Sequence, residues 1–465
     1  MPRLTVAQLA QAVEGRHFGS NHDLVVENIV TDSRQVTKGS LFVAIKGENF
    51  DGHDFANQAF QQGAAAVLVE KPLDNPLGSY ILVEDHIEAM ANLGRFCLAK
   101  HPVKIIGITG SIGKTSSKEI VAALLGESFK VLKSKGNLNT ETGLPITLYS
   151  LDESHQVVVL EMGMLGQGEI LHLTKIAPPD IAVITNVYGV HLERLGSVKN
   201  IAEAKAEIFQ GAKDQSYSIY RSQEEYAEIL KEKVKDRQLT YGLDSSNDIY
   251  LENLCLMGLK GSEFDLIFPG QVKVKTKIAL PGQHMAENAI LAAAVAYALG
   301  LSPESIAENL KNSSFIEQRS EIVRLKGNRL ILNDCYNASP ASMDAALKLM
   351  EELREDRSTL VVLGDMKELG EDEIKAHINL GERFADSAYD TIITKGPLAE
   401  LSGKIAAARE KSNLKHLNFT NNQEIIEALY GQLPENSLLL IKGSRSLALE
   451  TILPALKDFW GEQDE

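Results

Sequence analysis

Short apolar runs alternate with amphipathic stretches along most of this 465-residue chain. Short runs rich in β-branched residues predict buried strands, whereas longer stretches with apolar residues every three or four positions predict helices. The strands expected after residue 101 lie at 103–109, 131–132, 157–160 and 181–185. Helices are expected at 114–125 and at the alanine-rich stretch 283–300. Strands that alternate with helices are typical of a doubly wound parallel sheet.

A second alternating series begins after about residue 316, and a smaller α/β unit precedes residue 102. The strands of the second series are expected at 330–334, 360–363, 391–394 and 438–441. The length of the chain fits about three domains, because a single core stops growing at roughly 250–300 residues. We therefore predict an α/β fold with a small N-terminal domain at 1–101, a central parallel-sheet domain at 102–316 and a Rossmann-like domain at 317–465.

A phosphate-binding loop is expected directly after the run 103–109. It comprises Gly110, Ser111, Ile112, Gly113, Lys114, Thr115 and Ser116. A strand, a glycine-bounded turn and a helix start bring free backbone N–H groups to an anion. The longer P-loop pattern requires a further glycine where Ile108 stands, so an ordinary loop after a strand is the alternative. The position between a buried strand and a helix favours nucleotide binding.

Polar residues stand at the ends of several predicted strands, where ligands gather in open α/β sheets. Glu161 follows one strand, and Asn186 follows the next, with His191 a few residues beyond. A carboxylate one strand away from a phosphate loop is well placed to bind Mg²⁺, and a helix N-cap is the alternative role for Glu161. Taken alone, His191 fits a surface or core histidine, and Lys205 fits a solvated group on a helix that begins near residue 198.

Composition and charge narrow the class of protein. A net charge of −16 argues against a nucleic-acid partner, which would require a basic surface. The three cysteines contain no Cys-x-x-Cys pair, so neither a disulfide framework nor a cysteine zinc site is expected. The start of the chain has no long apolar stretch, and no apolar run reaches the roughly 18 residues that span a bilayer. We expect a cytoplasmic protein without membrane insertion.

Four groups of residues together resemble the Mur ligase family of ATP-dependent amide-bond-forming enzymes. They are the loop 110–116, the segment 135–145 (KGNLNTETGLP), Glu161-Met-Gly with Gly168-Glu-Ile170, and a C-terminal set at 334–340 (DCYNASP), 364–370 (GDMKELG) and 442–444 (KGS). The last set is particular to the member that joins D-alanyl-D-alanine to a UDP-N-acetylmuramoyl-tripeptide. The resemblance covers essentially the whole chain.

The resemblance implies a reaction in which ATP converts a carboxylate to an acyl phosphate that the dipeptide amine then attacks. It assigns ATP to Lys114 and the loop amides, and one Mg²⁺ to Thr115 and Glu161. A histidine followed 14 residues later by a lysine belongs to a second Mg²⁺ site in the family, and His191 and Lys205 meet that spacing. The family lysine is often carbamylated, which turns a cation into a metal-binding carboxylate equivalent. Lys114, His191 and Lys205 are thereby implied as catalytic residues.

The resemblance also assigns contacts to the nucleoside and to the substrates. Adenine and ribose are implied at Asn288, Arg319, Asp334 and Tyr336. The UDP-sugar and peptide substrates are implied at Ser33, Arg34, Lys46, Gly47, Asn139, Thr140 and Asn337. For the first four of these, a solvated turn is the alternative on residue grounds alone. We expect a monomer whose C-terminal domain swings about a hinge near residues 313–319.

Several residues depart from the family pattern: Ile112 and Ser339 each replace an asparagine, Met285 replaces another, and Glu317-Gln318 replaces Pro-Gly. None of these changes removes a charged catalytic group. One alternative is another ligase of the same superfamily, adding a different amino acid to a different acceptor. A second is a non-catalytic nucleotide-binding scaffold, which would not need two metal sites. The third residue of the tripeptide, lysine or diaminopimelate, is left open.

Overall fold

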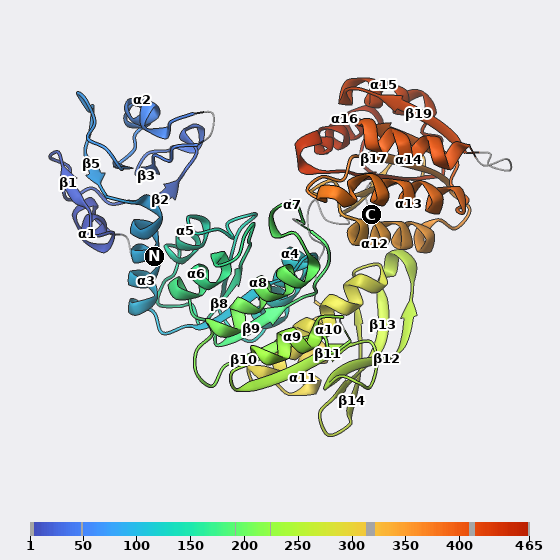
Figure 1. The fold of residues 1–465 in the computed structure, drawn as a ribbon, viewed down its shortest axis with the longest axis horizontal. Helices are drawn as coiled ribbons and strands as arrows, with labels where there is room; N and C mark the ends of the chain where they lie inside the picture. Colours follow the sequence, from blue (N-terminus) through green and yellow to red (C-terminus); the bar gives the residue numbers. More distant parts are fainter. Residues whose placement is uncertain are drawn as a thin grey trace.

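The computed structural model describes residues 4–47, 50–190, 192–223, 225–312, 321–408 and 414–463. Within these ranges the chain forms three sheets that follow one another along the sequence (Figure 1). The N-terminal and C-terminal sheets lie on either side of the central part in this view. No helix among the described residues is long and apolar enough to cross a bilayer.

The N-terminal sheet has the strand order β1-β5-β4-β3-β2, with β2 to β5 parallel and β1 antiparallel at the edge. Its strands are β1 (Arg16–Phe18), β2 (Asn28–Val30), β3 (Ser40–Val43), β4 (Ala66–Val69) and β5 (Tyr80–Leu82). Its helices are α1 (Val6–Ala12), η1 (Ser33–Gln35), η2 (Gly52–Phe55), α2 (Ala56–Gln61) and α3 (His86–Lys100). The β3 and β4 strands are buried throughout, as expected for parallel strands covered on both faces.

The central sheet has the order β14-β13-β12-β11-β10-β9-β6-β8-β7. Its strands are β6 (Lys104–Thr109), β7 (Val131–Lys133), β8 (Val157–Glu161), β9 (Ile181–Ile184), β10 (Tyr217–Tyr220), β11 (Arg237–Gly242), β12 (Ile249–Leu256), β13 (Ser262–Phe268) and β14 (Val272–Ile278). The helices are α4 (Lys114–Gly126), α5 (Gly143–Leu148), α6 (Glu169–Ile176), α7 (Leu192–Leu195), α8 (Val198–Gln210), α9 (Ala227–Glu232), η3 (Gly258–Lys260), α10 (Gln283–Ala298) and α11 (Pro303–Leu310). Strands β6 to β12 are parallel, and β13 and β14 add an antiparallel extension.

Helices cover both faces of the parallel part of this sheet. Ile106 and Ile108 of β6 belong to a core with α4 and α10, whereas Ile105 points into a core that includes α5, α6 and α8. Alternate side chains of one strand thus pack into opposite layers, because successive Cβ atoms point to opposite faces. The predicted doubly wound arrangement is confirmed, and the antiparallel extension was not predicted.

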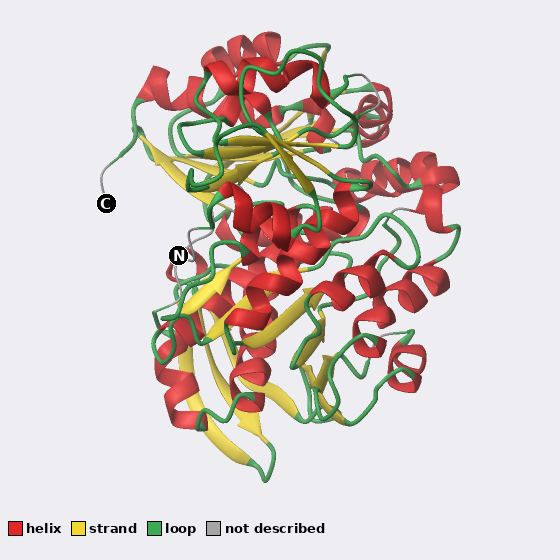
Figure 2. Cartoon of the chain, turned by 90° about the vertical axis from the view of Figure 1, so that its left-hand side faces the viewer, coloured by secondary structure: helices red, strands yellow, loops and turns green. Residues whose placement is uncertain are grey.

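The C-terminal sheet has the order β15-β16-β20-β17-β18-β19, parallel except for β15 at the edge. Its strands are β15 (Glu321–Leu325), β16 (Arg329–Asn333), β17 (Ser358–Gly364), β18 (Thr391–Lys395), β19 (Lys415–Phe419) and β20 (Ser437–Lys442). Its helices are α12 (Pro340–Leu353), η4 (Gly370–Asp372), α13 (Glu373–Ala385), α14 (Pro397–Ala407), α15 (Asn422–Gln432), η5 (Arg445–Leu447), η6 (Leu449–Thr451) and α16 (Ile452–Trp460). Figure 2 shows helices above and below this sheet.

Candidate active site

The predicted phosphate loop lies between β6 and α4 and depends on two glycines. Gly110 has φ +151°, and a Cβ there would lie 1.8 Å from Oγ1 of Thr185. Gly113 has φ +78° and occupies the N-cap of α4. Neither position accepts a larger residue without a shift of the backbone. The loop therefore leads into the N-terminus of α4, where the first-turn amides have no intrahelical acceptor and favour an anion.

The segment after β9 braces this loop. Asn186 accepts from the backbone amides of Ser111 (3.1 Å, at its carbonyl) and Ile112 (2.9 Å, at Oδ1). Thr185 Oγ1 donates to the carbonyl of Ile112 at 2.7 Å. In this structure the amides of Ser111 and Ile112 thus have partners within the protein, and the expectation that the loop amides hold phosphate stays a prediction. The amides at the start of α4 have no intrahelical acceptor and favour an anion as well.

The side chain of Lys114 curls back over the loop. Its Nζ donates to the carbonyl oxygens of Gly110 at 2.7 Å and Ser111 at 3.2 Å. The ammonium group thus lies above the glycine turn, where it can neutralise charge on a phosphate chain.

Thr115 and Glu161 meet as the sequence predicted, because β8 lies directly beside β6. The Thr115 hydroxyl donates to Oε2 of Glu161 at 2.9 Å, and Nδ2 of Asn139 donates to Oε1 at 2.9 Å. Glu161 is only 2% exposed. A hydroxyl oxygen next to a buried carboxylate is the set of hard oxygen ligands that Mg²⁺ prefers. These residues fit one Mg²⁺ beside the phosphate loop.

Lys205 lies on α8 and is buried. The helix is anchored by Glu207, whose carboxylate accepts from the amides of Gly168 (2.7 Å) and Leu171 (3.1 Å) at the start of α6. Burial, together with the nearby charge of Lys114, holds the pKa of the Lys205 amine well below its usual value. A protonated lysine does not fit a metal site, but a neutral amine can form a carbamate. His191, its predicted partner, lies outside the described residues.

The first turn of α10 contacts the phosphate-loop helix. Oδ1 of Asn288 accepts from the Ser117 hydroxyl at 3.2 Å, and lies 3.3 Å from the position of a Cβ on Gly113. His284, one turn earlier, is half-buried, and desolvation lowers the pKa of its imidazole. The polar start of α10 therefore lies beside the phosphate loop.

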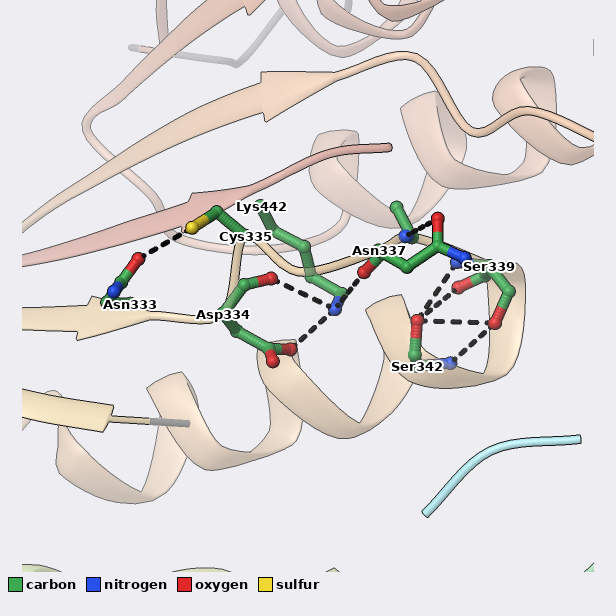
Figure 3. Close-up of polar contacts among 8 residues, drawn as sticks. Asn333, Asp334, Cys335, Asn337, Ser339, Ser342 and Lys442 are labelled. Atoms are coloured by element: carbon green, nitrogen blue, oxygen red, sulfur yellow. Dashed lines mark hydrogen bonds and ion pairs between the residues drawn. The ribbon is translucent and has the colours of Figure 1, made fainter. Parts of the chain in front are cut away.

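Polar residues of the C-terminal sheet gather at the end of β16 (Figure 3). Lys442, at the end of β20, is 1% exposed, and its Nζ lies 2.5 Å from Oδ2 of Asp334 and 3.1 Å from the carbonyl of Asn337. The Asp334 carboxylate and the Asn337 carbonyl are thereby tied to a neighbouring parallel strand. The ring of Tyr336 lies under the guanidinium of Arg445, 5.7 Å from its centroid.

One cavity of about 760 Å³ lies between the central and C-terminal domains and is lined by residues of both. From the central domain it is lined by Ser111, Ile112, Gly113, Lys114, Ser116, Asn139, Thr140, Glu161 and Asn288. From the C-terminal domain it is lined by Asp334, Tyr336, Asn337, Ser342, Lys367 and Lys442. The volume suits a substrate of nucleotide size. Of the predicted nucleoside contacts, Arg319 lies outside the described residues.

The four predicted diphosphate contacts lie in the N-terminal domain and do not line this cavity. Ser33-Arg34 follows β2, and Lys46-Gly47 follows β3, its parallel neighbour, so both pairs are at the same edge of the sheet. Arg34 is not a free cation: its guanidinium pairs with Asp32, with distances of 2.7–3.2 Å. A diphosphate would therefore meet an ion pair there.

Sequence reasoning did not select several polar residues that shape the site. Lys442 is part of the motif 442–444, and its position at the end of a predicted strand is the signal that could have identified it as a site residue. Asp365 is buried and accepts from the amides of Leu398 (3.1 Å) and Ala399 (2.7 Å), so it fixes the start of α14. Lys367 lines the cavity, and its backbone amide donates to the Ser444 hydroxyl at 2.9 Å.

Three family models match successive parts of the sequence. They are described as the Mur ligase family catalytic domain (residues 25–108), the Mur ligase middle domain (108–296) and the Mur ligase glutamate ligase domain (318–445). A Bacillus subtilis protein named UDP-N-acetylmuramoyl-tripeptide–D-alanyl-D-alanine ligase is 35% identical over 460 residues, which cover 98% of this chain and 99% of that protein. The chain belongs to the Mur ligase family. The predicted family and its ligase class are thereby confirmed.

Other Mur ligases align with nearly the whole chain in sequence and in structure. An Escherichia coli ligase of the same name is 33% identical, with 98% of this chain and 99% of that protein covered. A crystal structure of MurF from Acinetobacter baumannii is similar with a TM-score of 0.87 and 30% identity, covering 98% of this chain and all of that one. MurF ligase from Thermotoga maritima, solved in complex with ADP, has a TM-score of 0.78 at 29% identity, with 93% and 97% covered. The predicted three-domain α/β fold is confirmed.

Proposed function

We propose that this Mur ligase joins D-alanyl-D-alanine to a UDP-N-acetylmuramoyl-tripeptide at the expense of ATP, as a step of peptidoglycan precursor synthesis. The observation that carries the proposal is the cavity that unites the phosphate loop and Glu161 with the Asp334–Lys442 pair of another domain. Nucleotide use is supported by the ADP found in the Thermotoga maritima ligase. The substrates are those in the names of relatives that align over nearly the full chain.

The reaction needs two transfers. A carboxylate oxygen of the tripeptide attacks the γ-phosphorus of ATP, the bond to the β,γ-bridging oxygen breaks, and ADP leaves an acyl phosphate behind. The dipeptide amine then attacks the acyl carbon and loses a proton, and phosphate departs from the tetrahedral intermediate. Both transition states concentrate negative charge, so Lys114 and the N-terminus of α4 stabilise them by preorganised electrostatics.

Thr115 and Glu161 would hold one Mg²⁺, which neutralises phosphate charge when bound. We assign Lys205 to a second site as its carbamate, formed when the neutral amine adds to CO₂ and releases a proton. Desolvation supports this assignment, because it keeps the amine in its nucleophilic, neutral form. Removal of CO₂ should lower activity, and added bicarbonate should restore it. Unchanged activity without CO₂ would contradict the carbamate.

The remaining substrate contacts are assigned from the positions of the residues in the cavity and in the N-terminal domain. Asn288, Asp334 and Tyr336 line the cavity and are proposed to surround adenosine, together with Arg319. Asn139, Thr140 and Asn337 line it as well and are proposed to face the peptide. Ser33, Arg34, Lys46 and Gly47 are proposed to bind the uridine diphosphate at the edge of the N-terminal sheet. We infer a monomer that acts in the cytoplasm.

The amino-acid substrate can be tested by ADP release. With ATP, Mg²⁺ and the UDP-tripeptide present, D-alanyl-D-alanine should support turnover, whereas D-alanine, lysine, diaminopimelate and glutamate should not. Turnover with a single amino acid and a shorter acceptor would assign the chain to another Mur ligase reaction. ADP binding without turnover on any muramyl substrate would favour a nucleotide-binding scaffold.

A further inference from the structure

Lys118 is a charged residue in the interior of the central domain. It lies on α4, and its side chain is 0% exposed. Its Nζ donates to the carbonyl oxygen of Ser134 at 2.7 Å and lies 3.1 Å from Oε1 of Glu119. A buried ammonium group is costly even when it is paired, and an apolar side chain of similar length would fill the space without that cost. The charge at this position therefore points to a role other than core packing.

Ser134, the acceptor of this bond, connects Lys118 to the proposed metal site. It follows β7 and is itself buried, and its Oγ accepts from the backbone amide of Glu161 at 3.2 Å. Five residues later, Asn139 donates to Oε1 of Glu161 at 2.9 Å, and its carbonyl accepts from Gly163 at 2.8 Å. The segment 134–139 thus touches both the backbone and the carboxylate of Glu161.

Two residues of α4 therefore act on Glu161 from one side of the helix. Thr115 donates directly to Oε2, and Lys118, three residues later, reaches the backbone amide through Ser134. Residues three apart lie on the same face of a helix, so both contacts come from the face that packs on β7 and β8. The helix that carries the phosphate loop consequently sets the position of the carboxylate as well.

We propose that Lys118 is a positioning residue that keeps Glu161 and the segment 134–139 in register with the phosphate loop. The inference rests on the proposed function, in which Glu161 binds Mg²⁺ and Asn139 and Thr140 face the peptide. Lys118 is absent from the cavity lining and acts through Ser134. Its loss should weaken metal binding and acceptor binding while the phosphate loop still binds nucleotide.

The test compares Lys118→Met with Lys133→Met. Lys133 also pairs with Glu119, through a side chain that is 44% exposed, whereas the ammonium that donates to the Ser134 carbonyl is that of Lys118. Mn²⁺ is titrated by calorimetry into the protein in the presence of ADP, and KM for the UDP-tripeptide is measured separately. Lys118→Met should weaken Mn²⁺ binding by about tenfold and raise KM, with ADP affinity unchanged in the absence of metal. Lys133→Met should match the wild type within about twofold.

Ser134→Ala keeps the carbonyl that accepts from Lys118 and removes only the hydroxyl to which the Glu161 amide donates. This variant should also weaken Mn²⁺ binding. The double variant Lys118→Met/Ser134→Ala should lose less Mn²⁺ affinity than the product of the two single losses, because both residues act on Glu161 along one path. Wild-type Mn²⁺ affinity in folded Lys118→Met would overturn the proposal, and if that variant fails to fold, wild-type affinity in Ser134→Ala would do so. If the variants change Mn²⁺ binding as expected but the wild-type protein forms no product, the proposed function is contradicted and the positioning role is not.

Discussion

At the scale of single residues, the site is built from buried and half-buried charges whose partners fix their geometry. Glu161 is held by Thr115 and Asn139, and Asp334 by Lys442. Such groups are costly to bury, so each is kept in place by several hydrogen bonds. Lys205 differs from these charged groups, because desolvation favours the neutral form of its amine. Substitutions at these positions should therefore affect charge and geometry before they affect packing.

Replacement of Lys114 by methionine should remove the cation above the phosphate loop. We expect kcat/KM for ATP to fall by about 10³-fold, because a charge aimed at the transferred phosphate contributes several kcal/mol to the transition state. Steady-state phosphate release measures the change. Lys130→Met, an exposed lysine in the turn before β7, is the matched control and should leave the rate unaltered. Comparable losses in both variants would contradict the role of Lys114.

The lowered pKa of Lys205 predicts a pH-dependent stability. Between the folded pKa and the ordinary value of about 10.4, the unfolded chain binds a proton that the folded chain does not. The stability contributed by this residue therefore rises with pH in that window. In buffer free of CO₂, Lys205→Met should raise Tm more at pH 6 than at pH 9. Lys199→Met, exposed on the same helix, should show no such difference, and an equal shift at both pH values would contradict the prediction.

At the scale of elements, the site depends on neighbouring parallel strands. The order β9-β6-β8 brings Asn186, the phosphate loop and Glu161 to one edge of the central sheet. The order β16-β20 brings Asp334 beside Lys442 in the same way. In both sheets, residues far apart in sequence meet because the carboxyl ends of parallel strands lie together.

Gly110→Ala should disrupt the junction between β6 and α4. A Cβ there would lie 1.8 Å from Oγ1 of Thr185, at a φ of +151° that side chains other than glycine rarely adopt. We expect nucleotide binding to fall by at least tenfold, measured by calorimetry with ADP. Gly126→Ala, at the end of the same helix with open space around it, should retain binding and gain about 0.4–1 kcal/mol of stability. Retained binding in Gly110→Ala would show that the loop tolerates a shift.

Much of this arrangement was predictable from local pattern. The strands beneath the phosphate loop, Glu161 and Asp334 were buried apolar runs that ended in polar residues. The helix α8 begins at the expected residue, and α10 was predicted from its alanine-rich sequence. The antiparallel β13 and β14 were not recognised, although their sequences, SEFDLIF and VKVKTKI, alternate apolar and polar residues as half-buried strands do. The pairing of Asn186 with Ser111 and Ile112 could not be foreseen, because it depends on which strand lies next to β6. The proposed domain boundaries and site roles stay predictions.

At the scale of the whole molecule, the proposed ATP contacts are divided between two domains. The C-terminal domain meets the central domain where α12 approaches the start of α10 and where η4 approaches α7. The cavity lies between them, so its width depends on how the domains are docked. The hinge expected at 313–319 falls outside the described residues. A movement of the C-terminal domain on substrate binding is therefore predicted from the division of the site.

Small-angle scattering should detect this movement. The radius of gyration should decrease when an ATP analogue and the UDP-tripeptide are added together, because closure brings the C-terminal domain onto the central one. The analogue alone serves as the control for partial closure. Identical scattering with and without both ligands would contradict a closing motion.

The most direct test of the proposed function is phosphate release with ATP, Mg²⁺, UDP-N-acetylmuramoyl-tripeptide and D-alanyl-D-alanine, with each omitted in turn. We predict turnover only when all four are present, with one phosphate released for each amide bond formed. Turnover that does not need the dipeptide, or that needs a different amino acid, would contradict the proposed reaction.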